Sequence, residues 1–272
     1  MTTCLIDAPP GGEDSLATFL DGPSGRTLSL TLAESPSGRS RAKSLVARMY
    51  SRMGYRTEGL LPEGSGYATL LLSEAGGEDL GTLTVGSGAE GLRAEECYPD
   101  EIAALRRQGR SLCEFNALAM VPGHGSTTAL ARLFHAALLA GGPLFGHTDA
   151  VVEVNPTHVK FYERMLGFMR VGMAKSCPRV GAPSLLLNVD LVKGLERARE
   201  KGGHPEHRAS DRSLFPLFLN PLEGKLLAER LAERLFSPAR LLRSLRTGSW
   251  PSLPEGEPSG SCRSGHRPSV PA

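Results

Sequence analysis

One carboxylate in the sequence stands inside an otherwise apolar segment. Residues 112–121 read LCEFNALAMV, a run that predicts a strand at the centre of a sheet, apolar on both faces. Burying Glu114 there is costly unless the carboxylate is paired or used, and burial raises its pKa toward the range of a general base. Glu114 is therefore a candidate proton acceptor. The alternative is a structural ion pair with one of three arginines: Arg48, Arg52 or Arg106.

Two neighbours of Glu114 are candidate substrate-binding residues. Strand side chains alternate, so Asn116 faces the same side as Glu114 and can position an acceptor. Leu118 is assigned to the substrate-binding residues as well. Cys113 alternates to the opposite face and is interpreted as a small core residue rather than a nucleophile.

The predicted strand runs into a glycine-rich turn and then a helix. Residues 121–127 read VPGHGST, and glycines at such a turn let backbone N–H groups approach an anion at the helix N-terminus. A plain turn between strand and helix is the alternative. The candidate ligand-binding residues in this segment are Val121, Gly123, Gly125 and Ser126.

A tyrosine lies on the helix of a predicted β–α–β unit over residues 150–171, which opens with the apolar run AVVEV. Tyr162 can give a leaving group a proton or a hydrogen bond, and the alternative is an amphipathic tyrosine at the edge of the core. Phe161 lies on this helix and Asn155 just before it, and both are further candidates for contact with a substrate.

The elements that must position these residues alternate between strands and helices. A helix is predicted from residue 40 to 53, and a short helix from 100 to 108. A hairpin is predicted from strands at 66–73 and 79–85, and a last strand at 183–191. This order predicts a mixed α/β sheet in one domain, residues 39–192.

The ends of the chain are rich in glycine and proline. Residues 1–38 are predicted to be mostly disordered, apart from an edge strand at 26–32 in which leucines alternate with polar residues. Residues 193–246 are predicted to form a helical extension that begins with a polar loop, 193–210, and 247–272 a disordered tail. His204 and His207 are interpreted as part of that solvated loop rather than as metal ligands.

Composition narrows the class of protein. The net charge of +2 gives no global reason to expect nucleic acid as a partner. The five cysteines form no metal-ligand spacing with histidine, so no metal is predicted. Neither a secretory signal nor a membrane-spanning run is evident, which favours a cytoplasmic protein.

Several segments resemble known acyltransferases. Asn155, Tyr162 and the tripeptide Leu166-Gly167-Phe168 resemble the final motif of the GNAT superfamily. The blocks LVARMYSRMGYRTEG, GLRAEECYPDEIAALRRQG, EVNPTHVKFYERMLGF and CPRVGAPSLLLNVD occur in the order of the long-chain N-acyl amino acid synthases of the FeeM type, which are related to acyl-homoserine-lactone synthases. The resemblance covers about residues 41–192.

This resemblance implies a GNAT fold with a C-terminal helical extension and an enzyme that transfers a fatty acyl group to the α-amine of an amino acid. The donor would be a phosphopantetheine thioester, on acyl carrier protein or on CoA, with no tightly bound cofactor. Glu101 matches a second acidic position of the family, beside Glu114. Asn116-Ala117 departs from the usual Ser-Arg pair, which removes the expected contact for the acceptor's carboxylate.

The basic tail helix is a candidate surface for an acidic carrier protein or an anionic membrane. A plain amphipathic helix that covers the sheet is the alternative. Two other functions stay open at this stage, an acetyl-CoA-dependent acetyltransferase and a non-catalytic module that binds an acyl carrier. The basic residues of the tail are Lys225, Arg230, Arg234, Arg240, Arg243 and Arg246.

Overall fold

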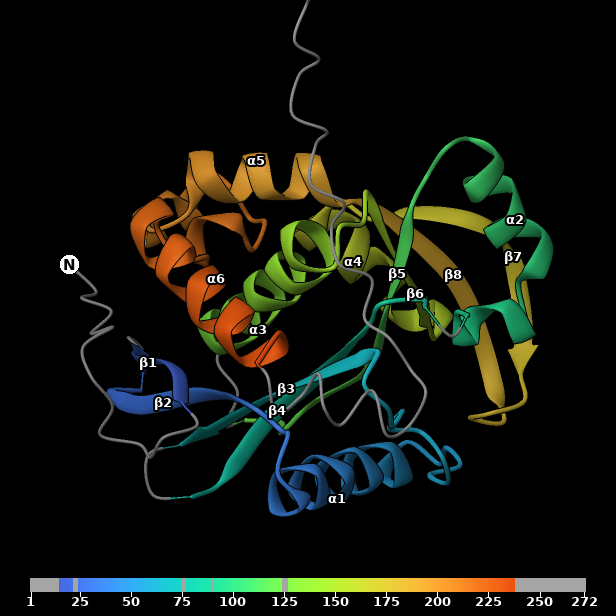
Figure 1. Ribbon diagram of the computed structural model, residues 1–272, viewed down its shortest axis with the longest axis horizontal. Coiled ribbons are helices and arrows are strands. Elements are labelled where there is room, and N and C mark those ends of the chain that lie inside the picture. Colours follow the sequence, from blue (N-terminus) through green and yellow to red (C-terminus); the bar gives the residue numbers. More distant parts are fainter. Residues whose placement is uncertain (1–14, 22–23, 75–76, 90, 124–126, 238–272) are drawn as a thin grey trace, which may run out of the picture.

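The computed structural model describes residues 15–21, 24–74, 77–89, 91–123 and 127–237, in which one eight-stranded sheet is covered by helices on both faces (Figure 1). From one edge to the other the strands are β1 (Ser15–Asp21), β2 (Arg26–Leu32), β3 (Tyr67–Glu74), β4 (Asp79–Gly86), β5 (Leu112–Met120), β6 (Asp149–Val154), β8 (Ala182–Asp190) and β7 (Met169–Cys177). Neighbouring strands pair antiparallel except β5 and β6, which are parallel. The predicted mixed α/β sheet is confirmed.

The helices fall between these strands along the chain. The α-helices are α1 (Pro36–Arg52), α2 (Pro99–Arg107), α3 (Thr127–Leu139), α4 (Val159–Leu166), α5 (Leu191–Lys201) and α6 (Pro221–Leu235). The short helical segments are η1 (Arg93–Glu96), η2 (Ala140–Leu144), η3 (Pro156–His158), η4 (Pro205–Ala209) and η5 (Phe215–Leu217). Among the described helices, none combines the length and apolar character that a membrane crossing requires.

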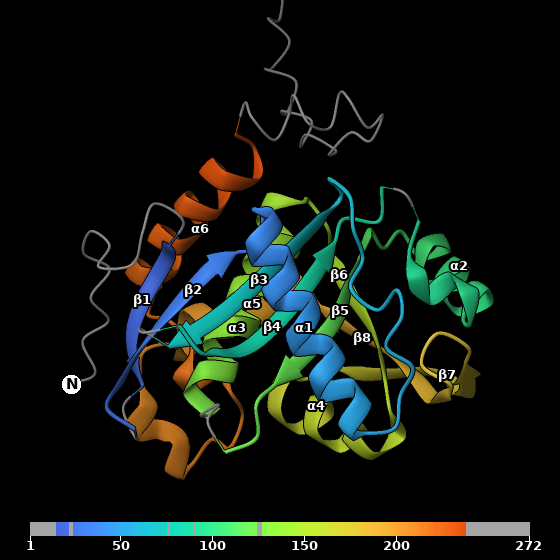
Figure 2. The same ribbon diagram turned by 90° about the horizontal axis from the view of Figure 1, so that it is seen from below.

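Helices cover the centre of the sheet on both faces. Figures 1 and 2 show α1 on one face and α3, α5 and α6 on the other. On α1 the buried residues Ala42, Leu45, Val46 and Met49 recur at helical spacing and pack against β3, β4 and β5. Ser35 caps this helix by accepting a hydrogen bond of 3.0 Å from the backbone N–H of Gly38, so α1 begins earlier than the predicted residue 40.

The edge of the sheet lies one strand further out than predicted. Residues 26–32 form β2, which pairs with β1 on one side and β3 on the other, so they are not an edge strand. The edge strand β1 lies within the segment 1–38 that was predicted to be mostly disordered. Leu16 and Phe19 of β1 are buried in the main core, and this burial stabilises a strand that the surrounding polar and glycine residues obscure in the sequence.

The predicted polar loop 193–210 contains a helix. Asp190 accepts a hydrogen bond of 2.9 Å from the backbone N–H of Lys193, and this cap starts α5. Leu191, Gly194 and Ala198 form a narrow buried stripe on an otherwise charged helix. Small residues at that spacing let α5 lie close to α3, and the polar face misled the sequence interpretation. His204 and His207 follow in the loop and in η4, both exposed.

The described part of the helical extension packs on the sheet's own core. Leu227, Leu231 and Leu235 of α6 are buried, and the helix contacts α3 and β1. The guanidinium of Arg230 donates a hydrogen bond of 3.1 Å to the carbonyl oxygen of Leu16 in the edge strand. The alternative of an amphipathic covering helix therefore describes α6, while Arg240, Arg243 and Arg246 lie outside the described residues.

A buried histidine joins α3 to this extension. The backbone N–H of Leu219 donates to Nδ1 of His135 over 3.1 Å, and the imidazole stacks on Phe218 with ring centroids 4.9 Å apart. A Cβ at Gly224 would lie 3.2 Å from the imidazole, so α6 can approach this closely because it carries a glycine there. Burial, with a smaller contribution from the charge of Arg132, lowers the pKa of His135 to about 3.

This histidine makes folding pH-dependent. The unfolded chain protonates His135 below its ordinary pKa of 6.5, whereas the folded chain keeps it neutral down to about 3, so stability falls as the pH drops through that window. We expect wild type to lose up to ~1.4 kcal/mol per pH unit more than His135→Gln in urea titrations. The control is His207→Gln, which changes an exposed histidine and should retain the wild-type slope. Equal slopes for wild type and His135→Gln would contradict this assignment.

Candidate active site

The two central strands separate after a short seam. Strands β5 and β6 pair only at Leu112↔Asp149, Cys113↔Ala150 and Glu114↔Val151 among the described residues. The seam is fixed at its base by Arg110, whose guanidinium lies 3.3 Å from the buried carboxylate of Asp149. Beyond Glu114 each strand keeps only its outer partner, β4 or β8, so the sheet opens between them.

A bulge turns β5 away from β6 at the same point. Thr84 pairs with Asn116 and Thr82 with Ala119, so two residues of β5, Ala117 and Leu118, stand opposite one residue of β4. Ala117 has φ of 51°, a left-handed backbone conformation that residues other than glycine rarely adopt. The bulge breaks the alternation along β5 that the sequence predicts, and it turns the strand where the sheet opens.

A cavity of about 520 Å³ lies where the strands part, within the range of small-molecule sites. Most of its wall is apolar. The β5 wall runs from Phe115 to Met120, and the β6 wall runs from Val152 to Val154 and continues to Asn155. The remainder includes Met49 and Tyr50 of α1, Met53 just after it, Leu130 and Phe134 of α3, Phe161 and Tyr162 of α4, and the turn between β7 and β8. A second hollow, of about 370 Å³, shares Leu60 and Arg93 with this cavity.

Five of the predicted site residues come together in this cavity. They are Asn116, Leu118, Asn155, Phe161 and Tyr162. Asn116 contributes a buried amide nitrogen without a hydrogen-bond partner among the described residues, and such a group is costly unless a ligand or water satisfies it. The spacing of these residues in the sequence therefore identified two opposite walls of one site.

The glycine-rich turn is only partly described. Pro122 lines the cavity between Val121 and Gly123, whereas neither of those two predicted residues does. Gly123 has φ of 78°, consistent with a tight turn. The predicted Gly125 and Ser126 lie outside the described residues.

Tyr162 is the centre of an aromatic cluster. Its ring meets Phe168, Phe161 and Phe134 edge to face, with centroids 5.3, 5.6 and 6.0 Å away. Burial raises the pKa of this phenol far above its ordinary value, so the hydroxyl stays protonated and can only donate or accept a hydrogen bond. Both sequence interpretations hold, since Tyr162 lines the cavity and packs in the core.

Glu114 lies just beyond the cavity wall. Its side chain is 2% exposed, and Oε2 accepts a hydrogen bond of 2.6 Å from the backbone N–H of Arg93, a residue that lines the cavity. Burial raises the pKa of Glu114, opposed by the N–H groups of Arg93 and Ala94 and by the positive charges of Arg179 and Arg93. The nearby cations are therefore these two arginines rather than the three expected from the sequence.

The structure does not bring Glu101 to the cavity. This residue lies on α2, and its carboxylate pairs with the ammonium of Lys175 at 2.9 Å. Burial raises the pKa of Glu101, but the hydrogen bond and charge of Lys175 outweigh that effect and leave it below the ordinary value. A carboxylate held in that ion pair is poorly suited to accept a proton from a substrate.

Two charged residues of the cavity escaped the sequence analysis. Glu153 of β6 and Arg179, in the turn between β7 and β8, form an ion pair on the cavity wall. Glu153 carried the same signal as Glu114, a carboxylate inside the apolar run AVVEV. Arg179 gave no signal of its own, because only the folded turn brings it across to β6.

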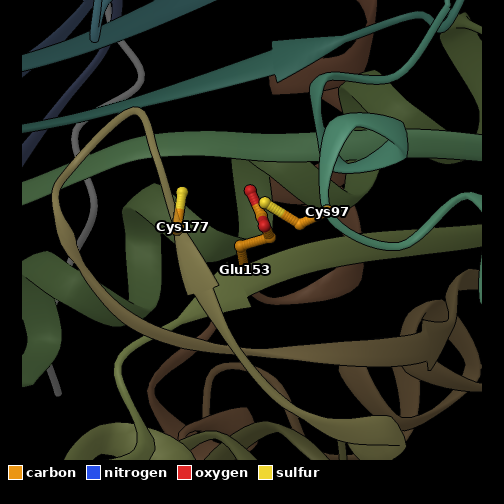
Figure 3. Close-up of side chains that lie close together, drawn as sticks. All are labelled: Cys97, Glu153 and Cys177. Carbon is orange, nitrogen blue, oxygen red and sulfur yellow. The ribbon is translucent and has the colours of Figure 1, made fainter.

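A cluster of two thiols and a carboxylate adjoins this pair. Figure 3 shows Cys97, Glu153 and Cys177, whose ligand atoms lie within 4.8 Å of one another. These are donor types that zinc accepts. However, Arg179 already neutralises Glu153, and burial together with the neighbouring thiol raises the pKa of Cys97 to about 11. A dication there would have to displace both a guanidinium and thiol protons.

The split sheet with a cavity at its opening defines the class as an acyltransferase of the GNAT fold. The family model of "N-acyl amino acid synthase FeeM" matches residues 41–190, and the chain belongs to that family. It is an N-acyltransferase. No curated protein matches the chain.

Three solved structures are similar to this chain to different degrees, and the first of them supports this class. The chain is similar to FeeM, an N-acyl amino acid synthase from uncultured soil microbes, with 26% identity and a TM-score of 0.55 over 62% of this chain and 93% of that one. TofI in complex with an inhibitor and MTA matches with 13% identity and a TM-score of 0.45 over 62% and 96%. A spermidine N-acetyltransferase from Vibrio cholerae, in complex with CoA and spermine, matches with 15% identity and a TM-score of 0.41 over 62% and 98%.

The bulge residue tests this description of the site. Ala117→Val places a β-branched side chain at φ of 51° and should cost about 2 kcal/mol of stability, whereas Ala117→Gly should change stability by less than ~1 kcal/mol. Chemical denaturation measures both. The control is Ala182→Val, at a cavity-lining strand position without positive φ, which should stay within ~0.5 kcal/mol. Equal costs at positions 117 and 182 would show that the bulge is not strained.

Proposed function

We propose that this enzyme transfers a long-chain fatty acyl group from a phosphopantetheine thioester to the α-amine of an amino acid. The observation that carries the proposal is the apolar cavity at the opening between β5 and β6. A thioester arm that enters between the strands would present its carbonyl at the bulge, and its acyl chain would lie against apolar wall residues such as Leu118 and Leu130.

Two protons leave the acceptor during the reaction: one ends on the thiol and the other on a base. The acceptor arrives as an ammonium, loses one proton to become nucleophilic, and loses a second after its N–C bond forms. The thiolate takes up one proton as the C–S bond breaks. Tyr162 is proposed as the hydroxyl beside the departing sulfur, supported by its protonated state and its place on the wall. Backbone N–H groups at the bulge are proposed to polarise the thioester carbonyl.

Glu114 is proposed as the group that finally holds the acceptor's proton. Its raised pKa supports this role, and Arg93 is the contact between its carboxylate and the cavity. Glu101 is not proposed to take part, because it is paired with Lys175 away from the cavity.

Acyl carrier protein or CoA is proposed as the carrier of the donor. None of the described α6 residues lines the cavity, so docking of a carrier protein or a membrane on that helix is not supported as a route to the site. A large apolar cavity also favours a long acyl chain over an acetyl group.

Replacing the buried carboxylate tests the chemistry. Glu114→Gln keeps an acceptor for the Arg93 N–H but removes the base, and we expect kcat to fall about 100-fold or more. In wild type, kcat/KM should fall as the pH drops toward the pKa of Glu114, which lies above the ordinary 4.5, and this acid limb should vanish in the variant. Mass spectrometry of N-acyl products from acyl-carrier and acyl-CoA donors measures both. Full activity in Glu114→Gln, or no N-acyl amino acid from wild type with either donor, would contradict the proposal.

Narrowing the cavity tests where the acyl chain lies. Leu130→Trp enlarges a half-buried side chain on the cavity wall, so turnover of a palmitoyl donor should fall about tenfold while an octanoyl donor is hardly affected. A competition assay with both donors gives the ratio directly. Leu222→Trp, at an exposed position on α6, serves as the control. Equal losses for the two chain lengths would place the chain elsewhere.

A further inference from the structure

Charge and apolar surface are segregated around the cavity. The aromatic cluster of Phe134, Phe161, Tyr162 and Phe168 forms one connected region. The second region is charged, and its members are linked through hydrogen bonds, ion pairs or neighbouring charge: Arg93, Arg179, Glu96, Glu114 and Glu153. A substrate that spans the cavity would therefore meet an apolar region and a charged one.

Within the charged region, Arg179 and Glu153 form an ion pair in which both the positive and the negative side chain line the cavity. The Arg179 side chain is 17% exposed and that of Glu153 is 9%, so the pair is largely shielded but touches the cavity. Shielded ion pairs seldom add stability over apolar residues, because both charges lose hydration. Apolar side chains at these two positions would therefore stabilise the fold at least as well as the ion pair does.

Bracing the turn does not require Glu153. One guanidinium nitrogen of Arg179 already donates 2.7 Å to the carbonyl oxygen of Arg93 and 2.6 Å to the carboxylate of Glu96. The other terminal nitrogen contacts Glu153, which comes from β6. A guanidinium has five N–H donors, so Arg179 retains donors for a further carboxylate after these contacts.

The opposite wall carries no charge. Between Phe115 and Met120, β5 contributes only apolar side chains and the amide of Asn116. An anionic group in the cavity thus has no cationic partner on β5. The arginines that line the cavity are Arg52, Arg93 and Arg179, and Arg179 is the one that pairs with Glu153.

We propose that the Glu153–Arg179 pair is the subsite for the acceptor's charged backbone, with Arg179 binding the α-carboxylate and Glu153 binding the α-ammonium. An amino acid zwitterion that enters between them exchanges one ion pair for two, with no change in net charge. The subsite selects α-amino acids over simple amines. This inference rests on the proposed acyl transfer and names the residues that recognise its acceptor.

The first test needs wild-type enzyme alone. Phenylalanine and phenethylamine differ by the carboxylate, as do leucine and isopentylamine, and each pair is supplied with a palmitoyl thioester. We expect kcat/KM to be about 10- to 100-fold higher for each amino acid, the usual value of a hydrogen bond to a charged group. Equal rates for amino acid and amine would overturn the subsite and leave the acyl transfer standing. Absence of any N-acyl product would overturn both.

Variants then assign the roles of the two residues. Arg179→Gln should reduce kcat/KM for phenylalanine about 10- to 100-fold and leave phenethylamine within about threefold, because phenethylamine has no carboxylate for Arg179 to bind. Glu153→Gln should impair both acceptors, since both carry the amino group. KM for the palmitoyl donor should stay at its wild-type value in each variant. A parallel loss on both acceptors in Arg179→Gln would show that Arg179 is only structural and would overturn the proposal.

Two further variants separate loss of the substrate contact from a folding defect. Arg179→Lys keeps the charge but loses the planar fork, so it should lower phenylalanine turnover less than Arg179→Gln and again spare phenethylamine. Arg170→Gln breaks an exposed ion pair with Glu163 and should leave both acceptors unchanged. If Arg179→Gln does not fold, Arg179→Lys and the wild-type comparison decide the question. Failure of Arg179→Lys to discriminate between the two acceptors would count against the subsite.

Discussion

The site depends on how briefly β5 and β6 stay together. Three paired positions join two half-sheets, β1 to β5 and β6 to β7, and the charge of Arg110 against Asp149 holds the base of that seam. A parallel pair that continued to the ends of both strands would leave no space between them. Because the ladder stops at Glu114 and β5 bulges at Ala117, backbone and side chains that would face a neighbouring strand face a cavity instead.

Helices behind the sheet replace the missing ladder. The segment from α3 through η2 crosses the back of the seam, where a Cβ at Gly141 would lie 2.7 Å from the sulfur of Cys113 and one at Gly142 would lie 3.0 Å from Leu195. Two adjacent glycines therefore let β5, η2 and α5 approach one another closely. The described part of the helical extension completes this layer through His135 and α6, so the part of the chain beyond β8 supports the core that holds the half-sheets in place.

Local signals in the sequence predicted the elements that carry the site. The apolar runs at 112–121 and 150–154 predicted the two central strands, and the burial cost of Glu114 singled out a carboxylate that is indeed enclosed. Spacing along one β–α–β unit was enough to place Asn155, Phe161 and Tyr162 together, because helix and strand geometry fix side-chain direction over short distances. Strand β1 and helix α5 were missed because tertiary burial, rather than composition, stabilises them.

Contacts between distant segments were beyond the sequence. Arg179 reaches Glu153 only after β7 and β8 fold back on β6, and no linear pattern encodes that meeting. Glu101 was assigned to the site by motif, yet its carboxylate forms an ion pair with Lys175 of β7. The bulge at Ala117 also breaks strand alternation, and a regular two-residue period cannot anticipate the break.

The glycine pair in η2 influences how wide a ligand can enter between β5 and β6. With so few main-chain rungs across the seam, the width of the opening is set by helix packing on the far side of the sheet, at Gly141 and Gly142. A larger side chain at either glycine would push η2 away from β5 or α5, although neither position lines the cavity. A larger side chain at Gly141 or Gly142 would therefore change the width of the opening without altering any residue that lines the cavity.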